Sequence, residues 1–472
     1  MTINTRTLVN PATGANIADI GDSTAGDVER SVRAAAAAGA EWGRSLPSQR
    51  ALVLHRLADL VEQHADELSH LDVEETGKPW AVMRDGELPF AVDNLRFFGA
   101  AARSLNGTAA GEFSTGYTSM LIRRPAGTVA AITPWNFPFV MAVWKVGAAL
   151  AAGCSVVLKP APTTPRSAMR LAELARQAGV PDDVFSVVLG DSAVGEALVT
   201  NELIDMITLT GSSATGRNVM RLAADRTARV HLELGGKAPF IVFADADLEA
   251  AAGAATLAAT YNSGQDCTAA TRVYVEAGAH GELVDAIEAS MRSVRIGDPY
   301  DADTDVGPLI TEQHRERVHG FVTRAAAAGA RIVVGGEPVD GIGSYYPPTL
   351  VVGAEQGAEI VRDEIFGPVL SVVPFVDEAD AIRLANDSAY GLASSVWTQR
   401  VDRGLRVAHL IEAGVTWIND HLPIASEMPH GGRGASGFGK DMGHDAILDF
   451  TYGHHVMVKH AEPAERTGFR PA

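Results

Sequence analysis

Cys267 is the side chain whose sequence surroundings most clearly suggest covalent chemistry. It lies in the polar, glycine-containing stretch 261–268, after an alanine-rich segment over 250–259 and before a predicted strand at 272–275. A thiolate is the best nucleophile among ordinary side chains near neutral pH, and a flexible polar turn would expose it to solvent and substrate. The second cysteine, Cys154, has apolar neighbours on both sides, which predicts a buried side chain. Cys267 is therefore the candidate nucleophile.

Two other side chains have the chemistry to assist a thiol. Glu233 stands between two leucines and before a double glycine, and a carboxylate in apolar surroundings has a raised pKa that suits a general base. Asn136 lies in the proline-containing loop 133–138 after a predicted strand, where its amide could donate to an oxyanion. A surface glutamate and an ordinary turn asparagine are the alternatives at these two positions.

Three more turns carry groups that could hold a cofactor. Lys159 ends the predicted strand 155–159 and could bind a ribose or a phosphate. The stretch 209–216 places free backbone amides at a helix N-terminus, which suits a pyrophosphate, although its glycines do not form the dinucleotide pattern G-x-G-x-x-G. Glu364 and Phe366 put a carboxylate and an aromatic ring two residues apart on a stiff turn.

Strands and helices that would position these groups alternate along the chain from about residue 128. Such alternation predicts βαβ units and parallel sheets. The short β-branched runs of the first series are 129–133, 155–159, 184–189 and 206–210. Those of the second series, which predicts a second α/β domain, are 240–243, 273–275, 332–334, 369–376 and 394–397. Upstream, residues 26–71 have the apolar spacing of two helices, with a helix start at Pro47.

Composition excludes several classes of protein. A chain of 472 residues is too long for one compact core and predicts two or more domains. The net charge of −19 argues against binding to nucleic acid or to an anionic membrane, and no apolar run approaches the roughly 20 residues that cross a bilayer. The polar segment 1–14 has no signal-peptide core, and two cysteines without framework spacing fit a reducing cytoplasm. We therefore expect a cytoplasmic protein that acts on a small molecule and has no metal site.

Taken in order, these stretches resemble the aldehyde dehydrogenase superfamily, and the resemblance covers essentially the whole chain from Asn10 to His460. Its most specific part is the glutamate motif around Glu233, followed downstream by the Gly-Gln-x-Cys motif at Cys267. The resemblance implies an α/β fold with a Rossmann-like parallel-sheet cofactor domain, an α/β catalytic domain and a small β oligomerisation arm. The implied ranges are 1–105 and 128–233 for the cofactor domain, 234–445 for the catalytic domain, and 106–127 and 446–472 for the arm.

The same resemblance implies a role for each motif. Cys267 is the nucleophile, Glu233 is the general base, and Asn136 forms the oxyanion hole with the backbone amide of Cys267. Lys145 and Asp441 correspond to a pair that relays protons from the base. Other implied roles concern the cofactor: Lys159 and Glu364 hold the two riboses, Phe366 packs near the nicotinamide, Gly211 and Ser212 face the pyrophosphate, and Ile132, Thr133, Trp135, Asn136, Thr215 and Leu234 line the same site.

Two departures from the family pattern bear on these expectations. Many NAD-preferring members carry a glutamate three residues after the lysine at position 159, whereas this chain has Pro162. We therefore expect NAD as the cofactor and leave NADP open. The segment before Asn10 is also shorter than usual, which predicts a truncated first strand pair.

Within the superfamily the chain most resembles the aminobutyraldehyde and betaine-aldehyde dehydrogenases, through stretches 264–270, 427–432 and 440–442. Phe137, Trp144 and Tyr261 could wall a tunnel whose aromatic faces attract a cation. Betaine-type members usually carry a tryptophan where this chain has His421, which weakens the case for a quaternary ammonium. A primary amine also wants a carboxylate, and the candidates for that group, with solvated surface charge as the alternative, are Asp93, Glu87 and Glu427.

The expected reaction is thus the oxidation of an ω-aminoaldehyde such as 4-aminobutanal. Betaine aldehyde or a semialdehyde is the alternative within the enzyme class, and a non-catalytic dehydrogenase-like binding protein is the alternative outside it. Retention of Cys267, Glu233 and Asn136 together favours the enzyme. We expect a homodimer or homotetramer, because the strand-like segments 116–123 and 450–459 resemble the family's subunit-exchanging arm, with a local hairpin as the alternative.

Overall fold

The first strand series forms a six-stranded sheet in the order β17-β9-β8-β5-β6-β7. The computed structural model describes residues 5–460. Five of the strands run parallel to one another, and β17 is antiparallel to β9. The strands are β5 (Thr128–Ile132), β6 (Ser155–Lys159), β7 (Phe185–Val187), β8 (Met206–Gly211), β9 (Arg229–Leu234) and β17 (Gly437–Phe438).

Strand order in this sheet creates a ligand-binding crevice. Numbered along the chain, the parallel strands lie in the order 3-2-1-4-5 that is typical of dinucleotide-binding sheets, and the order reverses between β5 and β8. The loops that follow these two strands leave the sheet in opposite directions, which opens a crevice at its carboxyl edge. The loop with Asn136 follows β5, and the turn with Gly211 ends β8.

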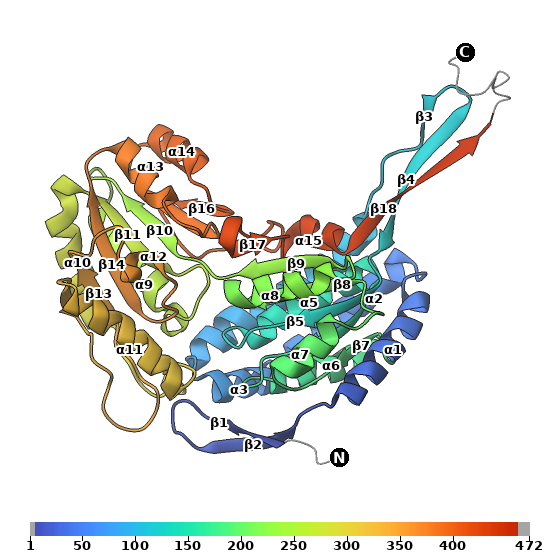
Figure 1. Cartoon of the computed structure of the whole chain (residues 1–472), viewed down its shortest axis with the longest axis horizontal. Helices are drawn as coiled ribbons and strands as arrows, with labels where there is room; N and C mark the ends of the chain where they lie inside the picture. The colour runs from blue at the N-terminus through green and yellow to red at the C-terminus, as the bar shows by residue number, and fades with distance from the viewer. Residues whose placement is uncertain (1–4, 461–472) are drawn as a thin grey trace.

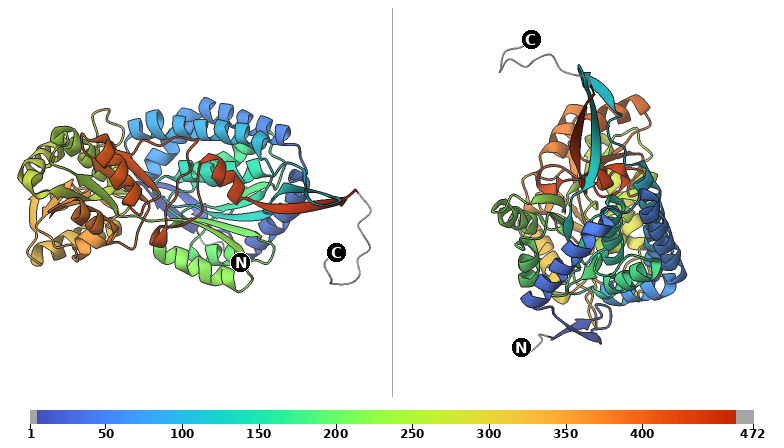
Figure 2. Two further views of the ribbon diagram at one scale, coloured as in Figure 1. Left: turned by 90° about the horizontal axis from the view of Figure 1, so that it is seen from above. Right: turned by 90° about the vertical axis from the view of Figure 1, so that its right-hand side faces the viewer.

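Helices cover both faces of this sheet, as the view from above shows (Figure 2). Along β5, Val129 and Ala131 belong to one apolar cluster and Ala130 belongs to the other, as the two-residue period of a strand requires. Helices of the first cluster are α2 (Pro47–Gln63), α3 (Ala65–Thr76), α4 (Leu88–Ala101), α5 (Pro138–Ala152) and α6 (Arg166–Ala178). Helices of the second are α1 (Ala25–Trp42), α7 (Ser192–Val199) and α8 (Ser213–Ala224).

The prediction of two helices over 26–71 is wrong, because three helices fall in or across this range. The helix start at Pro47 is confirmed, since α2 begins there. His64, with φ −101° and ψ 22°, ends α2 and precedes α3. The apolar pattern does not reveal this break, because Val61 and Leu68 on either side of it are both buried.

The second strand series forms a seven-stranded sheet in the order β12-β13-β14-β11-β10-β15-β16. All of its neighbours are parallel except β12, which is antiparallel to β13. The strands are β10 (Ala238–Val242), β11 (Ala270–Glu276), β12 (Arg331–Val334), β13 (Thr349–Val352), β14 (Val369–Phe375), β15 (Ala393–Trp397) and β16 (Val415–Ile418). The five strands predicted in this part are confirmed.

This sheet too is covered on both faces. α9 (Leu248–Thr260) and α10 (His280–Ser293) pack on one face. The helices on the other face are α11 (Glu312–Ala327), α12 (Glu359–Arg362), α13 (Glu378–Asn386) and α14 (Val401–Leu410). Figure 1 shows the resulting second lobe beside the first.

The carboxyl edge of the six-stranded sheet faces the amino edge of the seven-stranded sheet. Only residues 235–237 join the carboxyl end of β9 to the amino end of β10. Cys267 and Glu364 precede β11 and β14, so both lie toward the amino edge of the seven-stranded sheet. The motifs singled out in the sequence therefore gather between the carboxyl edge of one sheet and the amino edge of the other.

A three-stranded antiparallel sheet projects from the first lobe (Figure 1). It consists of β3 (Gly111–Ser114), β4 (Tyr117–Pro125) and β18 (Thr451–Lys459), and all nine residues of β18 pair with β4. Before reaching it the chain returns to the first sheet, because β17 pairs with β9 and α15 (Gly443–Asp449) packs in the core formed by α4 and α5. Residues 437–445, expected with the catalytic domain, thus lie against the first sheet. Residues 461–472 of the expected arm are outside the described residues.

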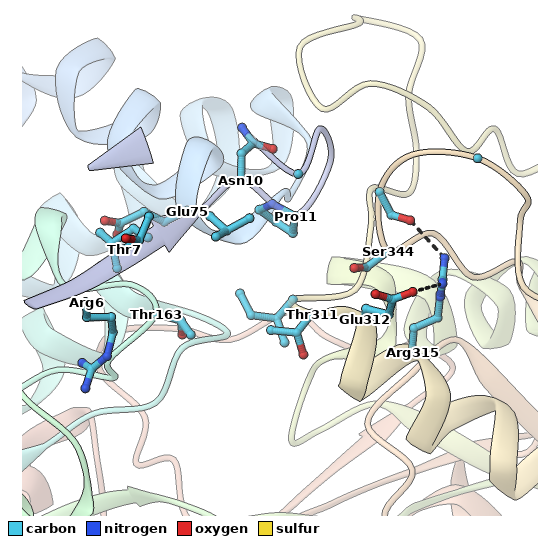
Figure 3. Close-up of a pocket in the computed structure, with 16 residues that line it drawn as sticks. Arg6, Thr7, Asn10, Pro11, Glu75, Thr163, Thr311, Glu312, Arg315 and Ser344 are labelled. Atoms are coloured by element: carbon cyan, nitrogen blue, oxygen red, sulfur yellow. Dashed lines mark hydrogen bonds and ion pairs between the residues drawn. The ribbon is translucent and has the colours of Figure 1, made fainter. Parts of the chain in front are cut away.

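The N-terminal strand pair is present rather than truncated. β1 (Thr5–Val9) and β2 (Asn16–Gly21) form an antiparallel hairpin with five paired positions. A cavity of about 410 Å³ separates this hairpin from the start of α11 (Figure 3). There Arg315 donates to the carbonyl of Gly343 and forms an ion pair with Glu312. No residue of this cavity lines the cavities around Cys267 described below.

Among residues 5–460, no helix combines the length and the apolar character that crossing a bilayer requires.

Candidate active site

Cys267 lies where two cavities of the interface between the sheets meet. The smaller, of about 300 Å³, extends toward β8 and α11, and we call it the cofactor-side cavity. The larger, of about 510 Å³, extends toward α4 and the loop after β16, and we call it the substrate-side cavity. Residues that line both are Phe137, Met141, Thr210, Leu234 and Cys267. A thiol at this junction can be reached from either side.

The loop that carries Cys267, which was predicted to be a flexible polar turn, is tied to its surroundings by hydrogen bonds. Asn262 and Ser263 have φ of 50° and 59°, a conformation that non-glycine residues adopt only when their surroundings impose it. The Ser263 hydroxyl donates to the carbonyl of Gly307 at 2.9 Å, and the Gln265 side-chain amide donates to the carbonyl of Asn262 at 3.2 Å. The polar residues that suggested mobility instead tie the loop to its neighbours.

Two glycines of the motifs are explained by close packing around the thiol. A Cβ atom on Gly264, which has φ +70°, would lie 2.3 Å from the carbonyl carbon of Gly367. A Cβ atom on Gly236 would lie 2.3 Å from the carbonyl oxygen of Cys267. Since real Cβ atoms do not approach so closely, any larger residue would push these loops away from the thiol.

The surroundings of the thiol keep it protonated in this structure. Burial raises the pKa of Cys267 well above its ordinary value, and the negative charges of Asp266, Glu364 and Glu233 add to this effect. A thiol in such a site needs a proton acceptor or a nearby positive charge before it becomes a nucleophile.

Glu233 is placed by β9 at the edge of the substrate-side cavity. Burial, and then the negative charge of Asp441, raises the pKa of its carboxyl group well above the ordinary value. This is the direction that its flanking leucines predict. Neither Oε atom has a hydrogen-bond partner among residues 5–460, and Nδ1 of His430 lies 3.9 Å from Oε2. The carboxylate is therefore free to bond a water molecule or a reacting group.

Lys145 and Asp441 form a buried ion pair beside this carboxylate. Nζ of Lys145 donates to the two carboxylate oxygens of Asp441 at 3.0 and 3.3 Å. Burial, the largest single effect, raises the pKa of Asp441, but the charge and hydrogen bond of Lys145 together with His231 and His430 hold the pKa below the ordinary value. Asp441 also lines the substrate-side cavity. The structure thus brings together the two residues expected to move protons.

The side-chain amide of Asn136 is fixed close to the loop of Cys267. Its Nδ2 donates to the carbonyl of Gln265 at 2.9 Å, and Nδ2 of Asn262 donates to the carbonyl of Asn136 at 2.9 Å. Both Asn136 and Cys267 line the cofactor-side cavity. A donor held this way beside a nucleophile has the placement that an oxyanion hole needs.

The cofactor-side cavity combines a helix N-terminus, a carboxylate and two aromatic rings. Ser212 caps α8, and its hydroxyl accepts from the backbone N–H of Thr215 at 3.2 Å. Glu364 accepts from the N–H of Gly236 at 3.0 Å, and burial raises its pKa to about 7. Trp135 and Phe366 meet edge to face with ring centroids 5.3 Å apart. These groups suit a pyrophosphate, a ribose and a flat ring, respectively.

A comparison of the sequence with known protein families shows which family this site belongs to. The model of the aldehyde dehydrogenase family matches residues 2–456. The chain belongs to the aldehyde dehydrogenase family. The family fold is confirmed along with it, because solved members of the family superpose on nearly the whole chain, as given below.

Individual relatives of this aldehyde dehydrogenase family member differ in the names they carry. 3,6-Anhydro-α-L-galactose dehydrogenase of Streptomyces coelicolor is 41% identical over 460 residues, covering 96% of this chain and 93% of the relative. The betaine aldehyde dehydrogenase of Staphylococcus aureus, solved with NAD+, is 32% identical with a TM-score of 0.96, covering 99% of this chain and 94% of that one. An NAD-dependent aldehyde dehydrogenase of Sinorhizobium meliloti is 37% identical with a TM-score of 0.97, covering 98% and 93%.

The structure sorts the residues predicted to bind the cofactor into two groups. Those that line the cofactor-side cavity are Trp135, Asn136, Gly211, Ser212, Leu234, Glu364 and Phe366. Those that lie outside its lining are Ile132, Thr133, Lys159 and Thr215. Members of this second group still belong to strands or turns at the same sheet edge, since Ile132 and Lys159 are paired at the carboxyl ends of β5 and β6.

Two residues of the cofactor-side cavity escaped the sequence analysis. His314 and Arg317 lie on the first turns of α11 and line the cavity. His314 packs edge to face against Trp135 at 5.5 Å, and its Nε2 lies 2.7 Å from the carbonyl oxygen of Phe366. In the sequence they belong to an ordinary charged helix, and nothing local distinguishes them from solvated residues.

The aromatic residues predicted to wall the substrate site lie around one cavity. Phe137, Trp144, Tyr261 and His421 all line the substrate-side cavity. The rings of Phe137 and Tyr261 stack with centroids 6.3 Å apart, and Nζ of Lys78 lies 4.7 Å from the centroid of Phe137. One cation of the protein therefore already contacts Phe137.

His421 has a bonding role as well as a place in this lining. Its Nδ1 lies 2.6 Å from the hydroxyl of Ser395 and its Nε2 lies 2.9 Å from the carbonyl oxygen of Thr268. Burial lowers the pKa of His421 to about 4, so the ring is neutral near pH 7. It joins the loop after β16 to the residue that follows Cys267.

Two of the three carboxylates considered for a substrate amine are not in the cavity. Asp93 and Glu427 are exposed and outside its lining, and Asp93 instead accepts from the hydroxyl of Ser426. Glu87 does line it, at the end of a π-helical segment over Val82–Glu87. Both of its oxygens accept from Nζ of Lys78 at 2.7 Å.

The charged groups that line the substrate-side cavity are acidic. Its lining includes five carboxylates and no lysine or arginine among the described residues. The five are Glu87, Glu233, Asp266, Asp420 and Asp441. Lys78 and Lys145 pair with two of them from behind the lining. The cavity is thus apolar and aromatic along its walls, and among the described residues no lysine or arginine side chain faces the ligand space.

Proposed function

We propose that this protein oxidises an aldehyde to a carboxylic acid, with Cys267 as the nucleophile and NAD as the cofactor. The observation that carries the proposal is the position of Cys267 at the junction of two cavities, with Asn136 beside one and Glu233 beside the other. A non-catalytic relative would have no need to keep all three groups converged on one point.

The cofactor-side cavity fits a nicotinamide dinucleotide. Gly211 and Ser212 present the N-terminus of α8 to a pyrophosphate, Glu364 offers a carboxylate to a ribose, and the rings of Trp135 and Phe366 flank a flat group. The chemistry that NAD supplies when bound is an acceptor for the hydride of the substrate carbon. Structures of relatives with NAD+ support this choice. Pro162 carries no carboxylate that would repel a 2'-phosphate, so NADP is the second candidate.

Cys267 gives its proton to water in the cavities on which it opens, and the thiolate attacks the aldehyde carbonyl to form a carbon–sulfur bond. The carbonyl oxygen becomes an oxyanion, to which the Asn136 amide and the backbone N–H of Cys267 donate. Loss of hydride from the same carbon leaves a thioester. Glu233 then removes a proton from a water molecule, the resulting hydroxide attacks the thioester, and the carbon–sulfur bond breaks to release the acid and the thiolate.

We propose an ω-aminoaldehyde such as 4-aminobutanal as the substrate. The lining supports this choice because it holds carboxylates and neither lysine nor arginine in the described part of the chain, and only two of the five carboxylates are paired with a lysine from behind. The faces of Trp144 and Tyr261 attract a cation by a further cation–π contribution, while Phe137 is already in contact with Lys78. This substrate would place the enzyme in polyamine catabolism.

Rates with matched aldehydes test the substrate proposal. Near neutral pH the amine is charged, and kcat/KM for 4-aminobutanal should exceed that for butanal about tenfold, because a desolvated cation–π contact is worth roughly 1–2 kcal/mol. The formation of reduced cofactor measures both rates, with cyclisation of the aminoaldehyde taken into account. Equal values for the two aldehydes would end the aminoaldehyde proposal and leave the dehydrogenase standing.

Betaine aldehyde is the second candidate substrate, favoured by the likeness to the Staphylococcus aureus enzyme of that name. Its kcat/KM should be measured in the same experiment. We expect it to be poorer than 4-aminobutanal, because the neutral, bonded ring of His421 stands where a further tryptophan would wall a quaternary ammonium. A higher kcat/KM for betaine aldehyde would reverse this order of the two candidates.

We further propose a cytoplasmic homodimer or dimer of dimers. The sheet of β3, β4 and β18 projects from the lobe (Figure 2). It carries large apolar side chains that are exposed to solvent. Those on the arm are Phe113, Ile122, Tyr452, Met457 and Val458. Light scattering of the active enzyme at micromolar concentration should show two or four subunits, and an active monomer would contradict the proposal.

A further inference from the structure

Two buried histidines flank the candidate base, and the chemistry described above uses neither. His231 is on β9 two residues before Glu233, and residues two apart on a strand face the same side of the sheet. His430 lies on the other side of the carboxylate, with Nδ1 3.9 Å from Oε2 of Glu233. His430 lines the substrate-side cavity, whereas His231 lies outside that lining. Of the two histidines, only His231 is therefore placed to carry a proton away from the ligand space.

His231 stands between a buried carboxylate and an accessible one. Its Nε2 lies 3.9 Å from Oδ1 of Asp441 and 3.9 Å from Oδ2 of Asp449. This nitrogen makes no side-chain hydrogen bond of ordinary geometry among residues 5–460, and the backbone of Lys440 lies close enough to the ring to raise its pKa slightly. The side chain of Asp441 is 1% exposed, while that of Asp449, the last residue of α15, is 38% exposed. The imidazole is thus the only ring within ion-pair range of both carboxylates in the described chain.

The other ring nitrogen holds the imidazole in place. Nδ1 of His231 lies 2.8 Å from the hydroxyl oxygen of Thr208, its neighbour across β8 and β9. In the tautomer that carries its proton on Nδ1, the ring donates to this hydroxyl and keeps a lone pair on Nε2, 3.9 Å from an oxygen of each carboxylate. Burial, the largest effect, lowers the pKa of His231, and Lys145 lowers it further, while Asp441 and Asp449 act in the opposite direction. The resting ring is therefore neutral and able to accept a proton.

Glu233 needs such an outlet. Each thioester hydrolysis leaves one proton on its carboxylate, which is 4% exposed and has no partner among the described residues. The neighbouring pair of Lys145 and Asp441 is equally buried, so a proton passed to it is still inside the protein. If the proton is to leave on the side away from the cavity, a further group must carry it on from this pair.

We propose that His231 conducts the proton of Glu233, received through Asp441, to Asp449 and the solvent. The inference rests on the proposed role of Glu233 as the base. Glu233 returns to its ionised form by giving its proton, through water in the cavity that both residues line, to the Asp441 carboxylate. Nε2 of His231 takes the proton from Asp441, and Asp449 takes it from Nε2 and exchanges it with water. Only O–H and N–H bonds form and break, and all four groups end as they began. A distance of 3.9 Å exceeds a hydrogen bond, and rotation of a carboxylate or one bridging water spans it.

Proton release measured together with cofactor reduction tests this path. A weakly buffered stopped-flow reaction with a pH-indicator dye follows protons, and absorbance of the reduced cofactor follows oxidation. In the variant His231→Gln, the first turnover of reduced cofactor should form at the wild-type rate, because Cys267 is untouched. Proton release and steady-state turnover should each slow about tenfold, and added imidazole should restore part of both. A merely structural role of His231 would not produce rescue by a small proton carrier.

A second variant keeps the proposal testable if the buried substitution impairs folding. Asp449→Asn alters a partly exposed side chain and should delay proton release in the same way, with the same response to imidazole. The matched control is Asp445→Asn, an exposed aspartate on the same helix α15, which should behave as the wild type. Proton release that keeps pace with the wild type in both His231→Gln and Asp449→Asn would overturn the proposal.

The variant Glu233→Gln separates this failure from failure of the proposed function. If Glu233→Gln turns over at the wild-type rate, Glu233 is not the base, and there is no proton on it for the proposed path to carry. If Glu233→Gln stops turnover while the His231 and Asp449 variants release protons normally, the base stands and only the path is wrong.

Discussion

Replacing Cys267 by serine should reduce aldehyde oxidation by about four orders of magnitude or more, while NAD binding changes little. Loss of an enzyme nucleophile typically has an effect of this size, because the remaining groups cannot form the covalent intermediate. Serine keeps the volume and the polarity of the side chain, so the packing of the loop against Gly236 should survive. Reduced-cofactor absorbance measures the rate, and equilibrium titration with NAD measures binding.

Cys154→Ser provides the matched control for the nucleophile. Cys154 is the only other cysteine in the chain, it is fully buried, and its Sγ lies 3.3 Å from the carbonyl oxygen of Phe450. Serine can make the same bond, so this variant should keep activity close to that of the wild type. Substantial oxidation by Cys267→Ser would refute the assignment of the nucleophile.

Replacing Glu233 by glutamine should lower steady-state turnover about 10²- to 10⁴-fold, the usual range for loss of a general base. The first turnover of reduced cofactor should persist as a burst, because the thioester forms but water is no longer activated. Stopped-flow absorbance separates the burst from the steady state. Equal loss of both phases would mean that Glu233 acts earlier, on the thiol of Cys267, rather than on water.

The pH profile provides an independent measure of the same group. A base works only when deprotonated, and burial raises the pKa of Glu233 well above its ordinary value. Turnover limited by thioester hydrolysis should therefore fall as the pH decreases through that raised pKa and reach a plateau above it. In Glu233→Gln this acidic limb should disappear. A wild-type rate that stayed constant as the pH decreased from neutrality to the range of an ordinary carboxyl would contradict the raised pKa.

Much of the candidate site could be predicted from local sequence, because its residues lie at the ends of strands. Carboxyl ends of parallel strands share one edge of a sheet, so the loop of Asn136 after β5 and the turn of Gly211 after β8 had to lie close together. Glu233 lies at the end of the neighbouring strand β9, and the short link to β10 brings the second sheet alongside. Strand pattern alone therefore placed most of the polar groups near one another.

The sequence did not show whether an isolated charged residue lies on the surface or in the interior. Asp93, Glu87 and Glu427 had equal standing as partners for a substrate amine, yet only Glu87 faces the cavity. Its orientation depends on the π-helical segment before α4 and on the ion pair with Lys78, neither of which has a local signature. The same limit hid His314, whose helix has the composition of a solvated one but packs against the loop after β5.

The sequence by itself determined the family, the strand series and the identity of the reactive groups, because these depend on residue type, short-range periodicity and spacing along one segment. Only the tertiary structure decided that hydrogen bonds tie the loop of Cys267 to its neighbours, that the thiol opens on two cavities, and that His231 stands between Asp441 and Asp449. Each of these depends on contacts between segments far apart in the chain. Burial, charge and geometry at such contacts are set by what the fold brings together, and no single segment carries that information.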